Sequence, residues 1–223
     1  MRMIDLSTEF RDGMPMPPSA PRVEMRYILQ HSAEEEAQKG FTNKMEQFTI
    51  TTHVATHIDA PSHFSMNGKN IDEYPVDFFY MVPTLMLNLD RDVYGEINAE
   101  DIKEAERKFG FIEEGDMVIL NTGAYRRYED PDYEKSPYLT EDAAQYLADR
   151  RIVMAAIDSF TVDDPRKKEK PAHVVLLCQH AIPVIECVVN LGEIPVHRFK
   201  TICMPLKVKN GSGAYTRMVA VLD

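Results

Sequence analysis

The chain lacks the long apolar segments that mark membrane and secreted proteins. No stretch approaches the roughly 18 apolar residues of a membrane-spanning helix. The opening residues 1–7 (MRMIDLS) have neither the apolar centre nor the cleavage site of a signal peptide, so we expect a cytoplasmic protein. Repeats and Gly/Ser-rich linkers are also missing, which favours one domain spanning residues 1–223.

Cysteine, tryptophan and positive charge are scarce as well. Tryptophan is absent, and the three cysteines, Cys178, Cys187 and Cys203, have apolar neighbours and no C-x-x-C pairing. This pattern is typical of free, packed thiols in a reducing compartment. The 36 acidic residues outnumber the 25 Lys and Arg residues, for a net charge of −11. Because such a chain repels phosphate groups and carries no basic stripe, nucleic acid and anionic membranes are not expected partners.

Potential metal ligands, in contrast, are concentrated in residues 53–64 (HVATHIDAPSHF). His53, His57, Asp59 and His63 follow the pattern H-x-x-x-H-x-D-x-x-x-H and include three of the seven histidines. Imidazole is the commonest metal-binding side chain, and a carboxylate adds oxygen ligands, so the run can hold a divalent ion. A single histidine is more often a packing or surface residue. Four ligand-type residues in one short run make coincidence a weaker explanation.

This run is predicted to lie where a strand ends. Residues 48–52 (FTITT) are rich in β-branched side chains, and the strand that they predict extends to His53. Pro61 and Ser62 break regular structure before His63. We therefore expect the ligands at a strand end and in the turn that follows, where functional sites commonly lie.

A second ion would need ligands from elsewhere in the chain. His173 lies on a predicted helix, with a helix-surface position as its ordinary alternative. Glu186 interrupts an otherwise apolar strand, where a buried carboxylate is costly unless it is paired or bound to metal; a solvent-facing position is its alternative. His180, near the end of the same helix, competes with His173 and could instead interact with the helix dipole.

Strand-like segments outnumber helix-like ones, which predicts a mixed α/β fold with a dominant sheet. The predicted strands are residues 3–6, 23–29, 48–53, 83–89, 116–121, 152–157, 182–189, 201–206 and 217–222. The predicted helices are residues 99–109 after an Asn98 cap, 141–151 after a Thr140 cap, and 171–179 opened by a proline. Polar residues 125–137 and 163–170 are predicted as exposed loops, and residues 30–44 as a loop that could lie near the site.

The run at residues 53–63 resembles H-x-G-T-H-x-D-x-P-x-H, the signature of the cyclase-like metal-dependent hydrolases. That family includes bacterial kynurenine formamidases and isatin hydrolases. The resemblance covers nearly the whole chain. Further segments similar to the family's motifs are residues 4–7 (IDLS), 13–17 (GMPMP), 115–123 (GDMVILNTG), 156–159 (AIDS), 171–173 (PAH), 184–186 (VIE) and 210–217 (NGSGAYTR).

The resemblance implies a swivelling β/β/α domain that assembles into homodimers or homotetramers. It also implies one or two divalent ions per chain, zinc or manganese. The ligands that it implies are His53, His57, Asp59, His173 and Glu186. Asp59 and Glu186 would bridge to the second ion, and His63 would donate and accept protons.

Three features depart from the family pattern. Ala55 stands in place of the signature glycine and restricts the backbone. The segment from His173 to Glu186 is one residue longer than in the family, and the turn at residues 179–181 is where we expect the additional residue. The family often has a tryptophan in a lid near the N-terminus. Without it, the residues expected to line the pocket are Met14, Met16, Phe64 or Tyr125.

The function expected from these residues is metal-assisted hydrolysis of a small-molecule amide, formamide or cyclic amide, at a C–N bond other than a peptide bond. The ion would lower the pKa of bound water towards about 7, and His63 would pass a proton to the leaving nitrogen. Two alternatives stay open: a non-catalytic metal or small-molecule binding protein, and a lactone hydrolase or dehydratase. Arg126 and Arg127 could bind a substrate carboxylate or lie in a solvated loop.

Overall fold

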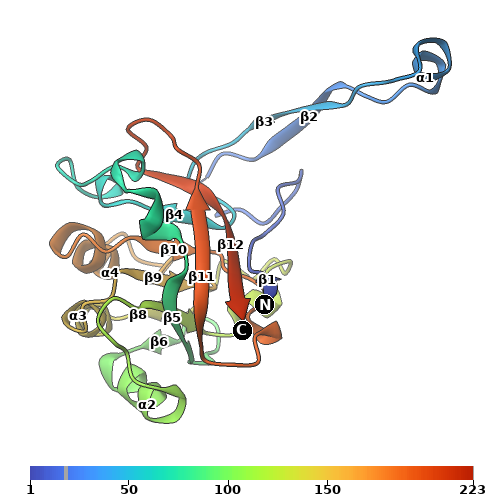
Figure 1. Ribbon diagram of the computed structural model, residues 1–223. Helices are drawn as coiled ribbons and strands as arrows, with labels where there is room; N and C mark the ends of the chain where they lie inside the picture. Colours follow the sequence, from blue (N-terminus) through green and yellow to red (C-terminus); the bar gives the residue numbers. More distant parts are fainter. Residues whose placement is uncertain (18–19, 223) are drawn as a thin grey trace.

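A closed, mixed sheet forms the centre of the computed structural model, which describes residues 1–17 and 20–222 (Figure 1). Its strands follow the order β12–β11–β5–β7–β9–β10–β4, and β4 pairs again with β12, which closes the barrel. β1 pairs with the end of β12 along the edge opposite β11. These strands are β1 (Arg2–Asp5), β4 (His57–Asp59), β5 (Val82–Asn88), β7 (Met117–Asn121), β9 (Met154–Ile157), β10 (Val184–Glu186), β11 (Arg198–Pro205) and β12 (Gly213–Leu222).

Helices cover the parallel part of the barrel. β5, β7, β9 and β10 are parallel neighbours, whereas the other strand pairs of the barrel are antiparallel. Parallel neighbours need long crossover connections, and these connections contain α2 (Ala99–Phe109), α3 (Glu141–Asp149) and α4 (Pro171–His173). All three lie on one side of the sheet (Figure 1). The structure confirms the mixed α/β, swivelling β/β/α class with a dominant sheet.

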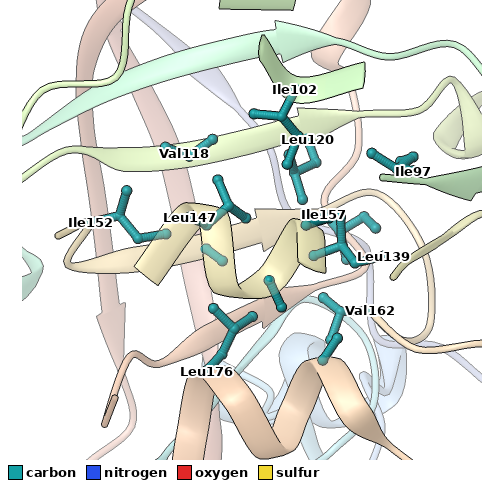
Figure 2. Packing of buried hydrophobic residues seen from close by; sticks show 14 of the residues in the cluster. Ile97, Ile102, Val118, Leu120, Leu139, Leu147, Ile152, Ile157, Val162 and Leu176 are labelled. Carbon is teal, nitrogen blue, oxygen red and sulfur yellow. The ribbon is translucent and has the colours of Figure 1, made fainter. Parts of the chain in front are cut away.

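Side chains alternate along the barrel strands between two hydrophobic layers. In β5, Leu85 and Leu87 belong to the layer under the helices, whereas Met86 belongs to the layer inside the barrel. Figure 2 shows the outer layer, in which Leu120 of β7 lies among Ile102 of α2 and other aliphatic side chains. β9, which lies within the predicted strand 152–157, is fully buried and contributes to both layers.

The predicted helices 99–109 and 141–151 are present, with small differences at their ends. Asn98 caps α2 in a capping box with Asp101, which accounts for the start of this helix. α3 ends two residues earlier than expected. Thr140 does not cap it with its side chain, because its hydroxyl donates to the carbonyl oxygen of Ile97 instead.

The predicted helix 171–179 changes its winding directly after His173. Residues Val174–Gln179 form a π-helix, and the amide of His180 donates to the carbonyl of Val175 at 3.2 Å, five residues back. A π-turn takes one residue more than an α-turn. The widened helix can therefore hold the additional residue between His173 and Glu186, whereas we expected that residue in the turn at 179–181.

Of the two strands predicted in residues 23–53, the first is confirmed to within one residue, whereas the second begins and ends earlier than predicted. β2 (Glu24–Leu29) and β3 (Met45–Thr49) form a hairpin of their own, and β3 ends before His53. Residues 30–44, predicted as a loop that could lie near the site, contain α1 (Ala33–Lys39), which lies at the far tip of this hairpin, away from the barrel (Figure 1). We call residues 24–49 the arm.

Short elements complete the described residues. β6 (Glu96–Ile97) and β8 (Tyr138–Leu139) pair beside the barrel. The 3₁₀ helices are Pro61–His63, Ile71–Glu73, Val76–Phe79, Ala124–Arg127 and Leu191–Glu193. Cys187 and Cys203 are buried free thiols as expected, but Cys178 is exposed. Within residues 1–17 and 20–222, the helices are all too short or too polar to cross a membrane.

The outer layer should be sensitive to the loss of a single side chain. Leu120 is fully buried under the helices, so Leu120→Ala removes contacts and leaves a cavity. We expect the free energy of unfolding, measured by chemical denaturation, to fall by about 2–5 kcal/mol. Leu206→Ala is the control, since Leu206 is 58 % exposed; its effect should stay within about 0.5 kcal/mol. Equal effects for the two variants would contradict this packing.

Candidate metal centre

Strand β4 places two of the predicted ligands on one face of the barrel wall. Alternate residues of a strand face the same side, so His57 and Asp59 project together, while Ile58 points into the barrel. Glu186 of β10 lies directly opposite His57 in the antiparallel pairing and joins the same face. Three acidic or imidazole groups therefore meet on the outer surface of the barrel.

His53 reaches this face from the bend that precedes β4. Its Nδ1 lies 2.6 Å from Asp59 Oδ1, and its Nε2 lies 2.8 Å from Ser212 Oγ. The ring passes close to the backbone of Gly213, where an added Cβ would stand 2.7 Å from His53 Cε1 and 2.6 Å from the carbonyl oxygen of Ile58. Glycine at this position thus leaves the room that the imidazole occupies.

His173 approaches the same carboxylates from the opposite side, on α4. Its Nε2 lies 3.3 Å from both Asp59 Oδ2 and Glu186 Oε1. Its Nδ1 lies 2.5 Å from Asp163 Oδ2. Asp163 also accepts hydrogen bonds from the backbone amides of Ala172 and His173, so the carboxylate is anchored to the start of the helix. A proton held between Nδ1 and Asp163 leaves the Nε2 lone pair directed at the carboxylates.

The donor atoms suit a divalent ion. They form two groups that share Asp59: His53 with His57, and His173 with Glu186, each set within 4.8 Å. His57 gives the clearest sign. Its Nδ1 donates to the carbonyl of Ala55 at 2.8 Å, so in the neutral ring that binds a metal the Nε2 is a buried acceptor, with no hydrogen-bond partner among the described residues. A cation at this point would satisfy that nitrogen and both carboxylates.

The turn at Ala55 explains why a glycine is typical of the signature. Ala55 has φ = 56°, in the left-handed region, which costs a non-glycine residue about 1–2 kcal/mol. The same turn directs the Ala55 carbonyl at His57. The backbone strain is therefore tied to the orientation of one predicted ligand.

Burial disfavours charge on His57, Asp59, His173 and Glu186, yet these carboxylates and imidazoles stabilise one another. Burial opposes protonation of His57, but Asp59 and Glu186 outweigh it and raise its pKa to about 9. Burial also opposes ionisation of Asp59, but His57 and His173 outweigh it and hold the pKa of this carboxyl well below its usual range. For Glu186 burial prevails and raises the pKa. This face of the barrel therefore attracts positive charge.

His63 lies beside the cluster without joining either donor group. It ends the 3₁₀ helix Pro61–His63 and stacks on His53, with ring centroids 3.7 Å apart. Neither ring nitrogen has a hydrogen-bond partner among the described residues. Burial lowers the pKa of His63 to about 4, with attraction by Asp59 opposing the shift and repulsion from His53 adding to it. The ring is thus neutral at neutral pH and keeps a free lone pair.

A cleft of about 260 Å³ opens over the cluster. Besides the predicted site residues, it is lined by Pro17, Phe64, Glu134, Phe160, Thr161, Pro165 and Lys170. Of the four side chains expected to line the pocket, Phe64 alone does so in the described residues, and it stacks on His173. Met14 is buried in another cluster, Met16 lines a neighbouring hollow and Tyr125 packs in the barrel layer.

The remaining candidates lie away from the cleft. His180 is exposed and contacts Gln145 rather than the carboxylates. Arg126 pairs with Asp90 at 2.8 Å, and Arg127 contacts the carbonyl of Asp132. Neither arginine is positioned to bind a substrate at this site.

Sequence reasoning missed the residues that orient the imidazoles. Asp163 was expected in a solvated loop, but it is fully buried against His173. Ser212 lies in a distant segment that only the barrel brings to His53. One signal in the sequence could have indicated Asp163: it lies shortly before the predicted helix that carries His173. Metal-binding histidines commonly donate a hydrogen bond from their second ring nitrogen to a carboxylate.

Buried imidazoles and carboxylates that converge on the outside of an α/β barrel, under an open cleft, define the class of metal-dependent hydrolases. Residues 4–164 match the family model described as putative cyclase, so the chain belongs to the cyclase family. The non-catalytic alternative is dropped: the chain is an enzyme, a metal-dependent hydrolase.

Curated relatives and solved structures agree with this family. The chain is 30 % identical over 174 residues, 78 % of each protein, to a kynurenine formamidase of Bacillus thuringiensis subsp. konkukian (strain 97-27). It is 25 % identical over 218 residues to that of Erythrobacter litoralis (strain HTCC2594), covering 98 % of this chain and 93 % of the relative. The structure of isatin hydrolase A from Labrenzia aggregata, bound to benzyl benzoate, is 26 % identical with a TM-score of 0.85, covering 98 % and 93 % of the two chains.

The role of Asp163 can be measured through metal affinity. Asp163→Asn should weaken binding of zinc or manganese, each titrated against a competing chelator, by about 10–100-fold, because His173 loses the carboxylate that fixes its tautomer. Asp164→Asn is the matched control, since Asp164 pairs with Arg166 and not with the cluster. Unchanged affinity in Asp163→Asn, or an equal loss in both variants, would contradict the assignment.

Proposed function

We propose that this enzyme hydrolyses a C–N bond other than a peptide bond, in a small amide, formamide or cyclic amide. The observation that carries the proposal is the position of Asp59 between two groups of metal-type donors, with His63 beside them and outside both groups. The names of the relatives, kynurenine formamidase and isatin hydrolase, support the substrate class.

In this proposal each predicted residue has one task. The ligand set is His53, His57, Asp59, His173 and Glu186. When bound, a divalent ion of this kind acidifies water and polarises a carbonyl oxygen. A ring nitrogen of His63 takes a proton from the attacking water and passes it to the leaving nitrogen. Such acid–base catalysis is worth about 10²–10⁴-fold in rate. Its place on the cleft wall, stacked on His53 and free of hydrogen-bond partners in the described residues, supports this task.

The number and kind of ions belong to the same proposal. The two donor groups share Asp59, which supports two ions per chain: His53, His57 and Asp59 would hold one, and Asp59, His173 and Glu186 would hold the other. Mixed nitrogen and oxygen donors suit zinc, and the carboxylates also suit manganese. We propose further that the protein is cytoplasmic and that residues 1–223 act as one domain. The two main hydrophobic layers share the same barrel strands, which supports the single domain.

Two substitutions separate the proton-transfer task from metal binding. His63→Ala should keep the bound metal, measured by elemental analysis, and lose about 10²–10⁴-fold in kcat on a formamide substrate such as formanilide. Asp59→Ala should lose both metal and turnover, because Asp59 belongs to both donor groups. Normal turnover in His63→Ala would reject its role. Metal retained at full content in Asp59→Ala would reject the ligand set.

We also propose that the protein is a homodimer or homotetramer held by the arm. A two-stranded hairpin is at best marginally stable alone in water, and every residue of β3 is exposed on this one. Ile28 on the arm is 54 % exposed and Phe41 60 %. Apolar side chains gathered on one projecting element are typical of a protein interface.

The arm can be tested by changing its apolar side chains. The double substitution Ile28→Ser with Phe41→Ser should shift the mass measured by light scattering towards that of the monomer, since it removes apolar area from the interface. Phe111→Ser is the control, because Phe111 is 62 % exposed on another part of the surface. A monomeric wild type, or an unchanged mass in the double variant, would contradict the proposal.

A further inference from the structure

One basic side chain, Lys170, lines the metal cleft together with the predicted ligands. It is half-buried and directly precedes α4, three residues before His173. Its carbonyl oxygen accepts a hydrogen bond from the amide of Val174 at 2.9 Å, and the next residue is Pro171, whose ring fixes the backbone. The backbone of Lys170, from which its side chain extends, is therefore held in place relative to His173.

The Lys170 ammonium has no ion-pair partner in the described part of the chain. Its contact to protein is a long one, 3.5 Å from Nζ to the carbonyl oxygen of Asp164. Two other cations of this loop face Asp164: Arg166 binds its carboxylate at 2.8 Å and Lys167 lies 3.7 Å from it. Lys168 is exposed and does not line the cleft. Lys170 is thus the cation of this loop that remains available to a molecule in the cleft.

The walls beside Lys170 are mainly apolar. Phe64, Phe160, Pro17 and Pro165 all contribute to the lining, and the cleft volume is about 260 Å³. This is near the lower end of ligand pockets, which commonly measure roughly 300–1,000 Å³. A group the size of one aromatic ring matches such a space. An ammonium among apolar walls is stabilised by an anionic group on that ring, because a charged hydrogen bond is stronger where water is excluded.

We propose that Lys170 is a substrate-binding residue that selects amides carrying a carboxylate on a small, one-ring group. The inference rests on the proposed function in one respect, that this cleft is the substrate site. Lys170 binds the carboxylate while the amide lies at the donor cluster, and the same contact holds the acidic product after hydrolysis. It therefore governs binding rather than the chemical step.

An alternative role for Lys170 is to balance the negative charge of Glu134. Its carboxylate also lines the cleft and likewise forms no ion pair among the described residues. A lysine that served only to balance Glu134 would affect neutral and anionic ligands alike. A lysine that recognises substrate affects the anionic ones alone, so paired probes distinguish the two roles.

The test uses the metal-loaded protein and matched aromatic compounds. Binding of 2-, 3- and 4-aminobenzoate and of neutral aniline is measured by calorimetry. Hydrolysis of the corresponding formamidobenzoates and of formanilide is measured in parallel. At least one aminobenzoate should bind the wild type more tightly than aniline. Lys170→Met should weaken that binding, and raise KM for the matching formamidobenzoate, by about 10–100-fold with little change in kcat.

Two further variants control for charge and for folding. Lys170→Arg keeps the cation and should retain the preference for the anionic compound. Lys168→Met removes one positive charge from an exposed position in the same loop that does not line the cleft, and should leave both ligands unaffected. Thermal unfolding of each variant verifies that the fold is kept.

The results overturn the proposal in either of two ways. One is that no aminobenzoate binds the wild type more tightly than aniline. The other is that Lys170→Met changes aniline and aminobenzoate binding equally, or changes neither. If an aminobenzoate binds in a Lys170-dependent manner while no formamide is hydrolysed, the Lys170 assignment stands and the proposed hydrolysis of formamides fails.

Discussion

The structure of the site depends on one buried carboxylate. Asp59 is 1 % exposed, and its two oxygens lie within 3.3 Å of nitrogens from three histidines. A carboxylate in this position is unfavourable without positive charge around it, because burial removes its hydration. The imidazoles supply this charge when protonated, and a divalent ion bound at the proposed site would supply it in their place. In the proposed metal site, Asp59 would therefore couple the stability of this region to metal binding.

The barrel makes this arrangement possible by bringing three distant segments into register. β4 is only three residues long, but it is paired on one side with β10 and on the other with β12. The first pairing sets Glu186 opposite His57. The second brings Gly213 and Ser212 to His53, one leaving space and the other contacting the ring. Since a shift of one residue would turn every side chain to the other face, the site requires this register.

The proposed metal site and the proposed substrate contacts lie on different parts of the molecule. The donor cluster lies on β4 and β10, on the bend before β4 and on the first turn of α4, whereas the rest of the cleft lining comes mainly from loops. Loops tolerate change more readily than strands do, so one donor cluster can serve different amides. In this chain Phe64 and Phe160 provide the aromatic walls in the absence of tryptophan, and Lys170 adds a positive charge.

The sequence by itself determined the fold class, one complete helix and most of a second, and six residues that line one cleft. These features depend on local signals: apolar periodicity, an asparagine cap, and a dense run of ligand-type residues. The tertiary structure decided what depends on contacts between distant segments. The sequence pattern extended one strand to His53, yet pairing gives residues 45–49 to a separate hairpin and residues 57–59 to the barrel. Asp163 and Ser212 became visible only once helix and barrel placed them against the imidazoles, because a hydrogen bond between remote residues leaves no periodicity or spacing in the chain.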